Sequence, residues 1–370
     1  MIFGGDKMNC MLNLKRITYP KDLVYDLTRL YTYRGKDFYY ANKLKQNKKN
    51  ITRSVIEKDT VYAAKILNLD VSDNRLKLIV KNDSEPKNNN EKIVRNLKNV
   101  FTILQERCDD PNYLNEKYLP NDLLAMANKV FKDVIKSVKY KTTKVKVNDT
   151  LIVEEKTVTA RDAMDELAKL YVDSINTYHY ETVQTIVSFY VDIINMDMFD
   201  HHNDFIALII VQTLLLNRQF YVFKYKSFFE ELYKNIRELK AALDLASFDW
   251  KRGYPKTENL NQIVLRIIIN CYEEVDFMAR NVEFDKTLTK FDNVKAAILK
   301  LGEVFSKEDI KKVCPNESES TINRALKCLK DEKKIEPDGT GRTAKWIRLT
   351  NDELFTTDKK QIDIFSYIKG

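Results

Sequence analysis

Hydrophobic residues are densest in one stretch of the chain, residues 186–230. Their spacing predicts a helix, a polar interruption at residues 197–204, and a second helix that is far more apolar. The longest apolar run, residues 205–216, contains Gln212 and Thr213 and is too short to span a bilayer. We therefore expect a buried helical hairpin at the centre of the fold and no membrane-spanning segment.

Most of the remaining chain before residue 286 also carries a helical period. Apolar residues recur every three or four positions, and Thr159 is a predicted N-cap. The scarcity of glycine (8) and proline (7) favours long helices over strands. The sequence predicts helices at residues 54–69, 91–106, 120–137, 159–177, 228–245 and 261–280, with a basic run at residues 43–53 before the first of them.

Around residue 148 the period changes from about four to two. Alternating residues from Lys144 to Val153 predict a β-hairpin with its turn near Asn148. Two interpretations stay open: an edge hairpin that covers the helical bundle, or a flap that receives an extended segment of a protein partner. The pattern by itself favours the first.

The segment 286–350 has a different texture from the helical region before it. Three short amphipathic helices, two of them opened by capping signals at Ser306 and Ser318, precede a glycine-rich turn between two strands. This order predicts a winged helix-turn-helix. Residues 351–370 are expected to be a tail.

A winged helix-turn-helix commonly binds DNA through its third helix and its wing. Lys and Arg would contact phosphates, while Asn and Arg would read bases. The candidate DNA contacts are Thr321, Asn323, Arg324, Lys327, Arg342 and Lys345. Acidic residues lie close by, so a protein-binding or dimerising role for this segment stays open; they are Glu317, Glu319, Asp331 and Glu332.

Composition adds few constraints. The 370 residues carry a formal net charge of +8, which permits nucleic-acid contact without requiring it. The five cysteines show neither metal-ligand spacing nor a disulfide framework. With no signal peptide expected, the sequence favours a cytoplasmic protein.

Several short sequence words occur in an order that resembles the Fic family. They are LYTYRGK at 30–36, DNRL at 73–76, PKNNNE at 86–91, VFKY at 222–225 and WKRG at 250–253. Active members of that family transfer AMP from ATP to a protein hydroxyl. The resemblance implies a mainly α fold: a Fic-like helical bundle with a β-hairpin flap, followed by a winged helix-turn-helix domain. It divides the chain into an N-terminal helical region, a core, the winged helix and a tail, at 1–115, 116–285, 286–350 and 351–370.

The catalytic motif of the family, H-P-F-x-D-G-N-G-R-x-x-R, aligns with residues 197–208, which are DMFDHHNDFIAL. Asp197 stands at the position of the general base and His201 at that of the acidic residue that holds the metal. Phe199, a packing residue in the family, and Asn203 match the motif. The resemblance therefore implies a degenerate motif.

The phosphate-binding positions of the motif are changed as well. His202 and Asp204 replace the two glycines that let backbone amides approach the phosphates, and Phe205 and Leu208 replace the two arginines. A triphosphate needs cations or an open nest of amides. We expect no catalytic residues, no metal site and no cofactor; ATP and Mg²⁺ would be bound only if some Fic activity persists.

The simplest interpretation of the loop is a solvated cap of the following helix, with Asn203 or Asp204 as its N-cap. A metal site at the adjacent His201 and His202 is disfavoured, because neighbouring histidines in a loop seldom point at one ion. The shape of the loop, open to an anion or filled by side chains, should discriminate between these cases.

Three hypotheses about function follow. The first is a Fic-fold pseudoenzyme with a binding or regulatory role, including DNA binding. The alternative is a divergent Fic adenylyltransferase with Asp197 as base and Asn203 as a phosphate contact. The third is an assembly role in which the bundle forms a homodimer.

Overall fold

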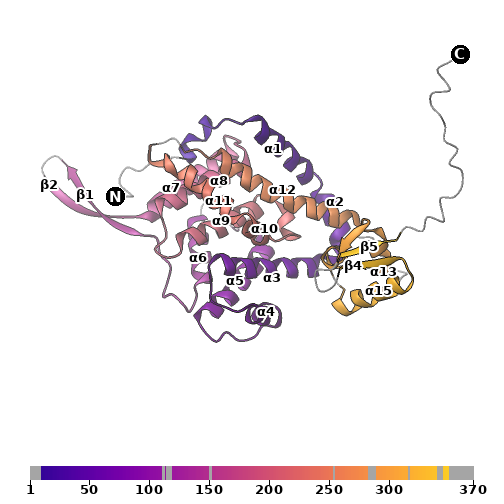
Figure 1. The fold of residues 1–370 in the computed structure, drawn as a ribbon. Helices are drawn as coiled ribbons and strands as arrows, with labels where there is room; N and C mark the ends of the chain where they lie inside the picture. Colours follow the sequence, from indigo (N-terminus) through magenta and orange to yellow (C-terminus); the bar gives the residue numbers. More distant parts are fainter. Residues whose placement is uncertain are drawn as a thin grey trace, which may run out of the picture. The chain divides into compact units, whose positions relative to one another are not determined.

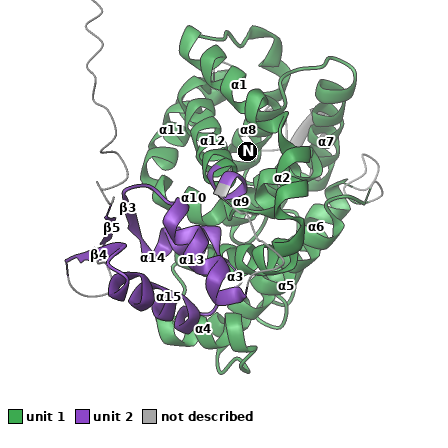
Figure 2. Cartoon of the chain, turned by 90° about the vertical axis from the view of Figure 1, so that its right-hand side faces the viewer, with its two compact units in different colours: residues 1–276 green, residues 277–370 purple. Residues whose placement is uncertain are grey.

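The computed structural model describes residues 10–110, 113, 119–149, 152–252, 255–281, 289–315, 317–339 and 345–349. The chain divides into two compact units, residues 1–276 and residues 277–370 (Figure 2). Unit 1 is almost entirely helical (Figure 1). Within the described ranges, none of the helices combines the length and the apolar character needed to cross a membrane.

The first part of unit 1 is a succession of helices. They are η1 (Met11–Arg16), α1 (Lys21–Arg34), α2 (Asp37–Leu44), η2 (Lys45–Asn47), α3 (Lys48–Ile66), α4 (Asp73–Asn82), α5 (Asn89–Arg107) and α6 (Leu119–Val130). The prediction that a helix begins at residue 54 was wrong, because α3 begins at Lys48 and includes most of the basic run. Ile51 and Val55 are buried on its inner face, while its lysines lie on the exposed face. Helix α4, which is capped by Ser72, was not predicted.

The predicted β-hairpin is present and is longer than expected. Strands β1 (Thr142–Asp149) and β2 (Ile152–Thr159) pair antiparallel, with Asp149 opposite Ile152. Asn148, where the turn was predicted, instead lies in β1 and pairs with Val153. Thr159 ends β2 and caps α7 (Ala160–Asn176), since its hydroxyl accepts a hydrogen bond from the Arg161 amide at 3.0 Å. That cap was predicted and is confirmed.

The central hairpin consists of α8 (Thr182–Met196) and α9 (Asn203–Asn217), and Figure 1 shows α9 within unit 1 among its neighbours. After η3 (Tyr221–Lys224), the predicted helix at 228–245 is two helices, α10 (Phe228–Lys234) and α11 (Ile236–Phe248). Asn235 separates them, and its side-chain amide donates to the Glu231 carbonyl at 2.9 Å. η4 (Trp250–Arg252) and α12 (Glu258–Asn281) follow.

Two fully buried carboxylates attach distant segments to this centre. Asp192 in α8 accepts hydrogen bonds from the amides of Cys10 and Met11, at 3.0 and 2.9 Å, and from the Trp250 indole at 2.7 Å. Asp59 in α3 accepts from the hydroxyl of Ser227, from the amide of Phe229 and from the side chain of Gln212, at 2.6, 2.9 and 2.9 Å. Each of these buried carboxyl groups thus accepts three hydrogen bonds.

Unit 2 contains α13 (Lys290–Lys300), β3 (Val304–Ser306), α14 (Lys307–Val313), α15 (Glu319–Asp331), β4 (Ile335–Asp338) and β5 (Lys345–Arg348). The strands form an antiparallel sheet in the order β3-β5-β4, of which β3 was not predicted. Ser306 forms a capping box with Asp309, and the Ser318 hydroxyl caps α15, so both predicted capping signals are confirmed. The apolar faces of the three helices enclose a separate core.

Candidate functional site

The loop between α8 and α9 begins and ends with a left-handed residue. Asp197 has φ 48° and closes α8 through its amide, which donates to the Ile193 carbonyl at 3.0 Å. His202 has φ 50° and precedes α9. Left-handed backbone costs a non-glycine residue about 1–2 kcal/mol, so the fold holds this loop in a shape that glycine would adopt more readily.

The loop is joined by main-chain hydrogen bonds to the segment that leads into the flap. The Asp200 amide donates to the Lys139 carbonyl at 3.0 Å, and the Lys141 amide donates to the Met198 carbonyl at 2.9 Å. Between these bonds Tyr140 forms an isolated β-bridge with Phe199, and their rings stack at 5.2 Å. Phe199 is therefore a buried packing residue.

Asn203 fastens the loop from its other side. Its side-chain oxygen accepts a hydrogen bond from the Phe199 amide at 3.2 Å, and its side-chain nitrogen donates to the Ile193 carbonyl at 3.3 Å. The residue is only 7% exposed. The expectation that Asn203 or Asp204 is the N-cap of α9 was wrong: His202 holds that position and makes no side-chain capping bond. Asn203 is instead used to satisfy two main-chain groups of the loop and of α8.

The other side chains of the loop pack or face solvent. The His202 ring stacks on Phe131 at 4.5 Å. Burial, and then the neighbouring His201, lower the pKa of His202, which disfavours the charged form of its ring. Phe205 and Leu208 are buried, and the ring of Phe205 lies 6.1 Å from that of Phe229. The two positions where the resemblance places arginines thus belong to the core.

The remaining predicted residues do not form a cluster of cations or ligands. Asp197 forms an ion pair with Lys141, which comes from the segment before the flap. His201 is exposed and makes no hydrogen bond or ion pair with another described residue. Asp200 accepts a hydrogen bond from the Lys139 amide at 2.8 Å. In the part of the chain that the structure describes, no three His, Cys, Asp or Glu side chains come together as a metal-binding group.

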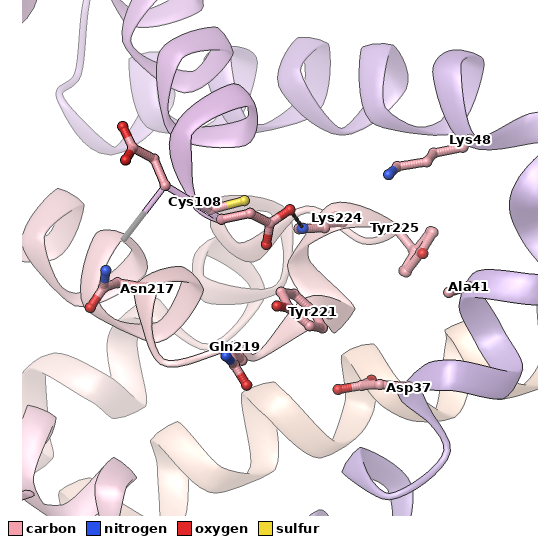
Figure 3. Close-up of a pocket in the computed structure, with 11 residues that line it drawn as sticks. Asp37, Ala41, Lys48, Cys108, Asn217, Gln219, Tyr221, Lys224 and Tyr225 are labelled. Atoms are coloured by element: carbon pink, nitrogen blue, oxygen red, sulfur yellow. Dashed lines mark hydrogen bonds and ion pairs between the residues drawn. The ribbon is translucent and has the colours of Figure 1, made fainter. Parts of the chain in front are cut away.

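A second concave site lies beyond the C-terminal end of α9 (Figure 3). This cavity measures about 390 Å³ and is lined by residues of α2, α3, the end of α5 and η3. Lys224 forms an ion pair with Asp109 at 2.6 Å, and its amine lies 4.2 Å from the centre of the Tyr221 ring. Burial raises the pKa of the Cys108 thiol at the same site.

Asp37 is the unusual group of this cavity. Burial raises its pKa to about 7, although the Tyr272 hydroxyl donates to it at 3.2 Å and lowers the value. Its other oxygen has no hydrogen-bond partner among the described residues. This site was not predicted, because its residues come from separated segments of the chain. The sequence VFKY at residues 222–225 contributes Lys224 and Tyr225 to the cavity, but it was considered only for its resemblance to the Fic family.

The predicted DNA contacts lie on two elements of unit 2. Asn323, Arg324 and Lys327 are exposed along one face of α15, and Lys345 is exposed on β5. Thr321 is partly buried, and its hydroxyl lies 2.9 Å from that of Ser318. The structure thus places three candidates on one face; Arg342 lies outside the described residues.

One aromatic ring restrains the central candidate of that face. The Arg324 guanidinium lies 4.8 Å from the centre of the Phe291 ring, so the side chain is held at the surface of the unit rather than extended into solvent. A ligand that binds this face must either leave the contact between Arg324 and Phe291 in place or supply another partner for Arg324.

Sequence comparisons identify no relative: no family model matches the chain, and no curated protein matches it. By structure, the chain is similar to a Fic family protein. The crystal structure of a Fic family protein from Desulfovibrio desulfuricans G20 aligns with a TM-score of 0.54 and 14% sequence identity, covering 90% of this chain and 98% of that chain. At this identity the likeness establishes the fold. The predicted mainly α, Fic-like helical bundle with a β-hairpin flap is confirmed.

Proposed function

We propose that this chain is a Fic-fold protein that does not transfer AMP and acts as a binding or regulatory protein, with unit 2 as a DNA-binding winged helix-turn-helix. One observation carries the first half of this proposal. Asn203, one of two residues that match the family motif, is buried and uses both ends of its amide on the loop's own backbone. Its groups are therefore not available to a phosphate.

The residues of the loop also do not fit a nucleotide triphosphate. Residues 197–208 contain three aspartates and no lysine or arginine. Lys141, the cation beside the loop, is already paired with Asp197. Each uncompensated aspartate would repel a phosphate charge by on the order of 1 kcal/mol. We therefore assign no ATP, metal or AMP-transfer step to this site.

The alternative is a divergent adenylyltransferase in which Asp197 acts as base and Asn203 holds a phosphate. Asp197 would first have to leave Lys141, and Asn203 would have to release Phe199 and Ile193. Loss of a positioned general base alone costs about 10²- to 10⁴-fold in rate. These requirements favour the pseudoenzyme.

Calorimetric titration of the full chain with ATP and Mg²⁺, together with an assay for AMP transfer, separates the two functions. We expect no saturable binding below about 1 mM, a dissociation constant that corresponds to roughly 4 kcal/mol of binding free energy. Stoichiometric micromolar binding would refute the proposal. AMP transfer that is lost in Asp197→Ala and retained in Asp244→Ala, an exposed control in α11, would refute it as well.

The DNA-binding half rests on the exposed face of α15. Asn323, Arg324 and Lys327 supply a base-reading amide and two cations on a helix that follows a short turn.

Fluorescence anisotropy with labelled duplexes tests DNA binding. We expect Arg324→Ala to weaken binding by about 5- to 150-fold, which corresponds to the 1–3 kcal/mol of a good base contact. Arg237→Ala, an exposed arginine on α11, is the matched control and should leave the affinity unchanged. An equal loss in both variants, or no binding to any duplex at low salt, would refute this half of the proposal.

A further inference from the structure

Unit 1 carries an open groove that belongs neither to the α8–α9 loop nor to unit 2. η2 and α3 form one side of it, and residues of α4 and α5 form the other; Figure 1 shows α3, α4 and α5 in the same part of unit 1. The groove measures about 770 Å³. Several of its lining residues belong to the basic run at residues 43–53.

The rim of this groove carries more lysine side chains than there are acidic side chains paired with them. Lys45, Lys48, Lys49 and Lys81 are exposed, and none forms an ion pair with another residue that the structure describes. They come from both sides of the groove. Like charges that line one groove repel, and an anionic partner would relieve that repulsion.

The other charges at the groove are already matched. Arg53 forms an ion pair with Glu57 at 3.0 Å. Lys98 forms an ion pair with Asp83. Because the acids of the rim are held by these two cations, the four unpaired lysines remain as the excess charge.

The lining also indicates which kind of anionic partner fits. Ile56 is the one apolar side chain among the described residues that line the groove; Gln46, Thr52 and Thr102 supply polar groups. Protein interfaces depend on aromatic or aliphatic anchors, and single-stranded nucleic acids depend on aromatic rings for stacking. No aromatic ring is among the described residues that line this groove, and Ile56 is a single aliphatic side chain there. Unpaired lysines with polar neighbours suit the phosphate backbone of a duplex.

We propose that this groove binds the phosphate backbone of a nucleic-acid duplex without regard to sequence. The contact would be made by unit 1 itself and does not depend on DNA binding by α15. A chain with both surfaces would combine a sequence-independent contact from unit 1 with a sequence-reading contact from unit 2.

The salt dependence of duplex binding by the full chain tests the proposal. The groove variant is K45Q/K48Q/K49Q/K81Q, in which glutamine removes the charge and keeps a high helix propensity. The control is K15Q/K21Q/K169Q/K240Q, which removes four exposed lysines of unit 1 that lie outside the groove. Affinities for two duplexes of unrelated sequence are measured by anisotropy across a range of salt concentrations.

We expect the groove variant to have a shallower slope of log affinity against log salt, by about 3 to 4, since each phosphate contact contributes about 0.9. When the salt concentration rises fourfold, the parent chain should therefore lose about 150-fold more affinity for the duplex than the groove variant loses. The control variant should keep the slope of the parent chain. Equal slopes in the parent chain and the groove variant would overturn the proposal, as would an equal loss in the control.

Two further measurements identify the surface and the partner. The four groove lysines should contribute to the salt slope even in the double variant R324A/K327A of unit 2. If that double variant has already lost the contribution of these lysines, the groove proposal fails. If the effect of Arg324→Ala is absent while the groove variant behaves as expected, only the proposed function of α15 fails. Lysine-dependent binding to phosphatidylserine vesicles, with no binding to duplexes, would assign the groove to a membrane surface and overturn the proposal.

Discussion

Replacing Asp59 by asparagine should stabilise the protein at alkaline pH. Asp59 is fully buried, and burial raises its pKa from 3.8 to about 7, against the lowering effect of hydrogen bonds from Ser227, Phe229 and Gln212. Between these two pH values the folded chain binds a proton that the unfolded chain releases. The free energy of unfolding therefore falls as pH rises from about 4 to about 7. The difference between 3.8 and about 7 corresponds to roughly 4 kcal/mol.

The surrounding contacts are suited to a neutral side chain. Ser227 and Phe229 both donate to Oδ1 of Asp59, an oxygen that asparagine keeps. Gln212 donates to the other oxygen, while its own Oε1 is buried without a hydrogen-bond partner among the described residues. A flip of the Gln212 amide would let Oε1 accept a bond from the new asparagine amide. We expect Asp59→Asn to raise the free energy of unfolding by about 2–4 kcal/mol at pH 8 and by little at pH 4.

Urea unfolding at pH 4, 6 and 8 measures this effect. The two tryptophans of the chain lie in different units, so a Trp346→Phe background leaves the buried Trp250 to report on unit 1. Asp70→Asn, an exposed position, is the control and should change neither stability nor its pH dependence. Destabilisation of Asp59→Asn at pH 8, or an unchanged fall in stability between pH 4 and pH 8, would refute the reasoning.

Three other substitutions test contacts described above by urea or thermal unfolding. Asp192→Ala removes the acceptor of three buried donors and should cost about 3 kcal/mol or more; a loss below 1 kcal/mol would mean that those donors find other partners. Asn203→Ala leaves the Phe199 amide without its acceptor, while the Ile193 carbonyl keeps the bond from the Asp197 amide, and should cost about 1–3 kcal/mol; a neutral result would show that the loop does not need this side chain. Lys141→Met removes a partly exposed ion pair with Asp197 and should cost less than about 1 kcal/mol, so a larger loss would contradict its assignment as a surface pair.

The sequence predicted best where local chemistry decides the structure. Thr159, Ser306 and Ser318 cap their helices as expected, because each cap involves an amide only two or three residues away. The predicted helix at 91–106 agrees with α5 for the same reason, since its apolar positions recur at a regular helical period.

The predictions failed where distant segments decide. Asn203 was expected to cap α9 because local rules favour it there, but its side-chain oxygen instead accepts from the Phe199 amide, four residues before it in the loop. The break at Asn235 was missed because helical periodicity continues through it. The residues of the cavity around Asp37 and Lys224 are separated by almost two hundred positions, and no pattern along the chain indicates that they meet.

The way the flap is attached makes it a convenient place to modify this protein. Thr142 and Thr159 pair at its base, and the Ala160 amide donates to the Lys141 carbonyl at 2.8 Å, so the chain enters and leaves the flap at neighbouring points. Residues 143–158 could therefore be replaced by a short turn, or by an inserted domain, without pulling the two ends apart. A flapless chain made in this way would keep the bonds from Lys139 and Lys141 to the α8–α9 loop. A partner that binds the full chain but not the flapless chain would thereby be identified as one that depends on the flap.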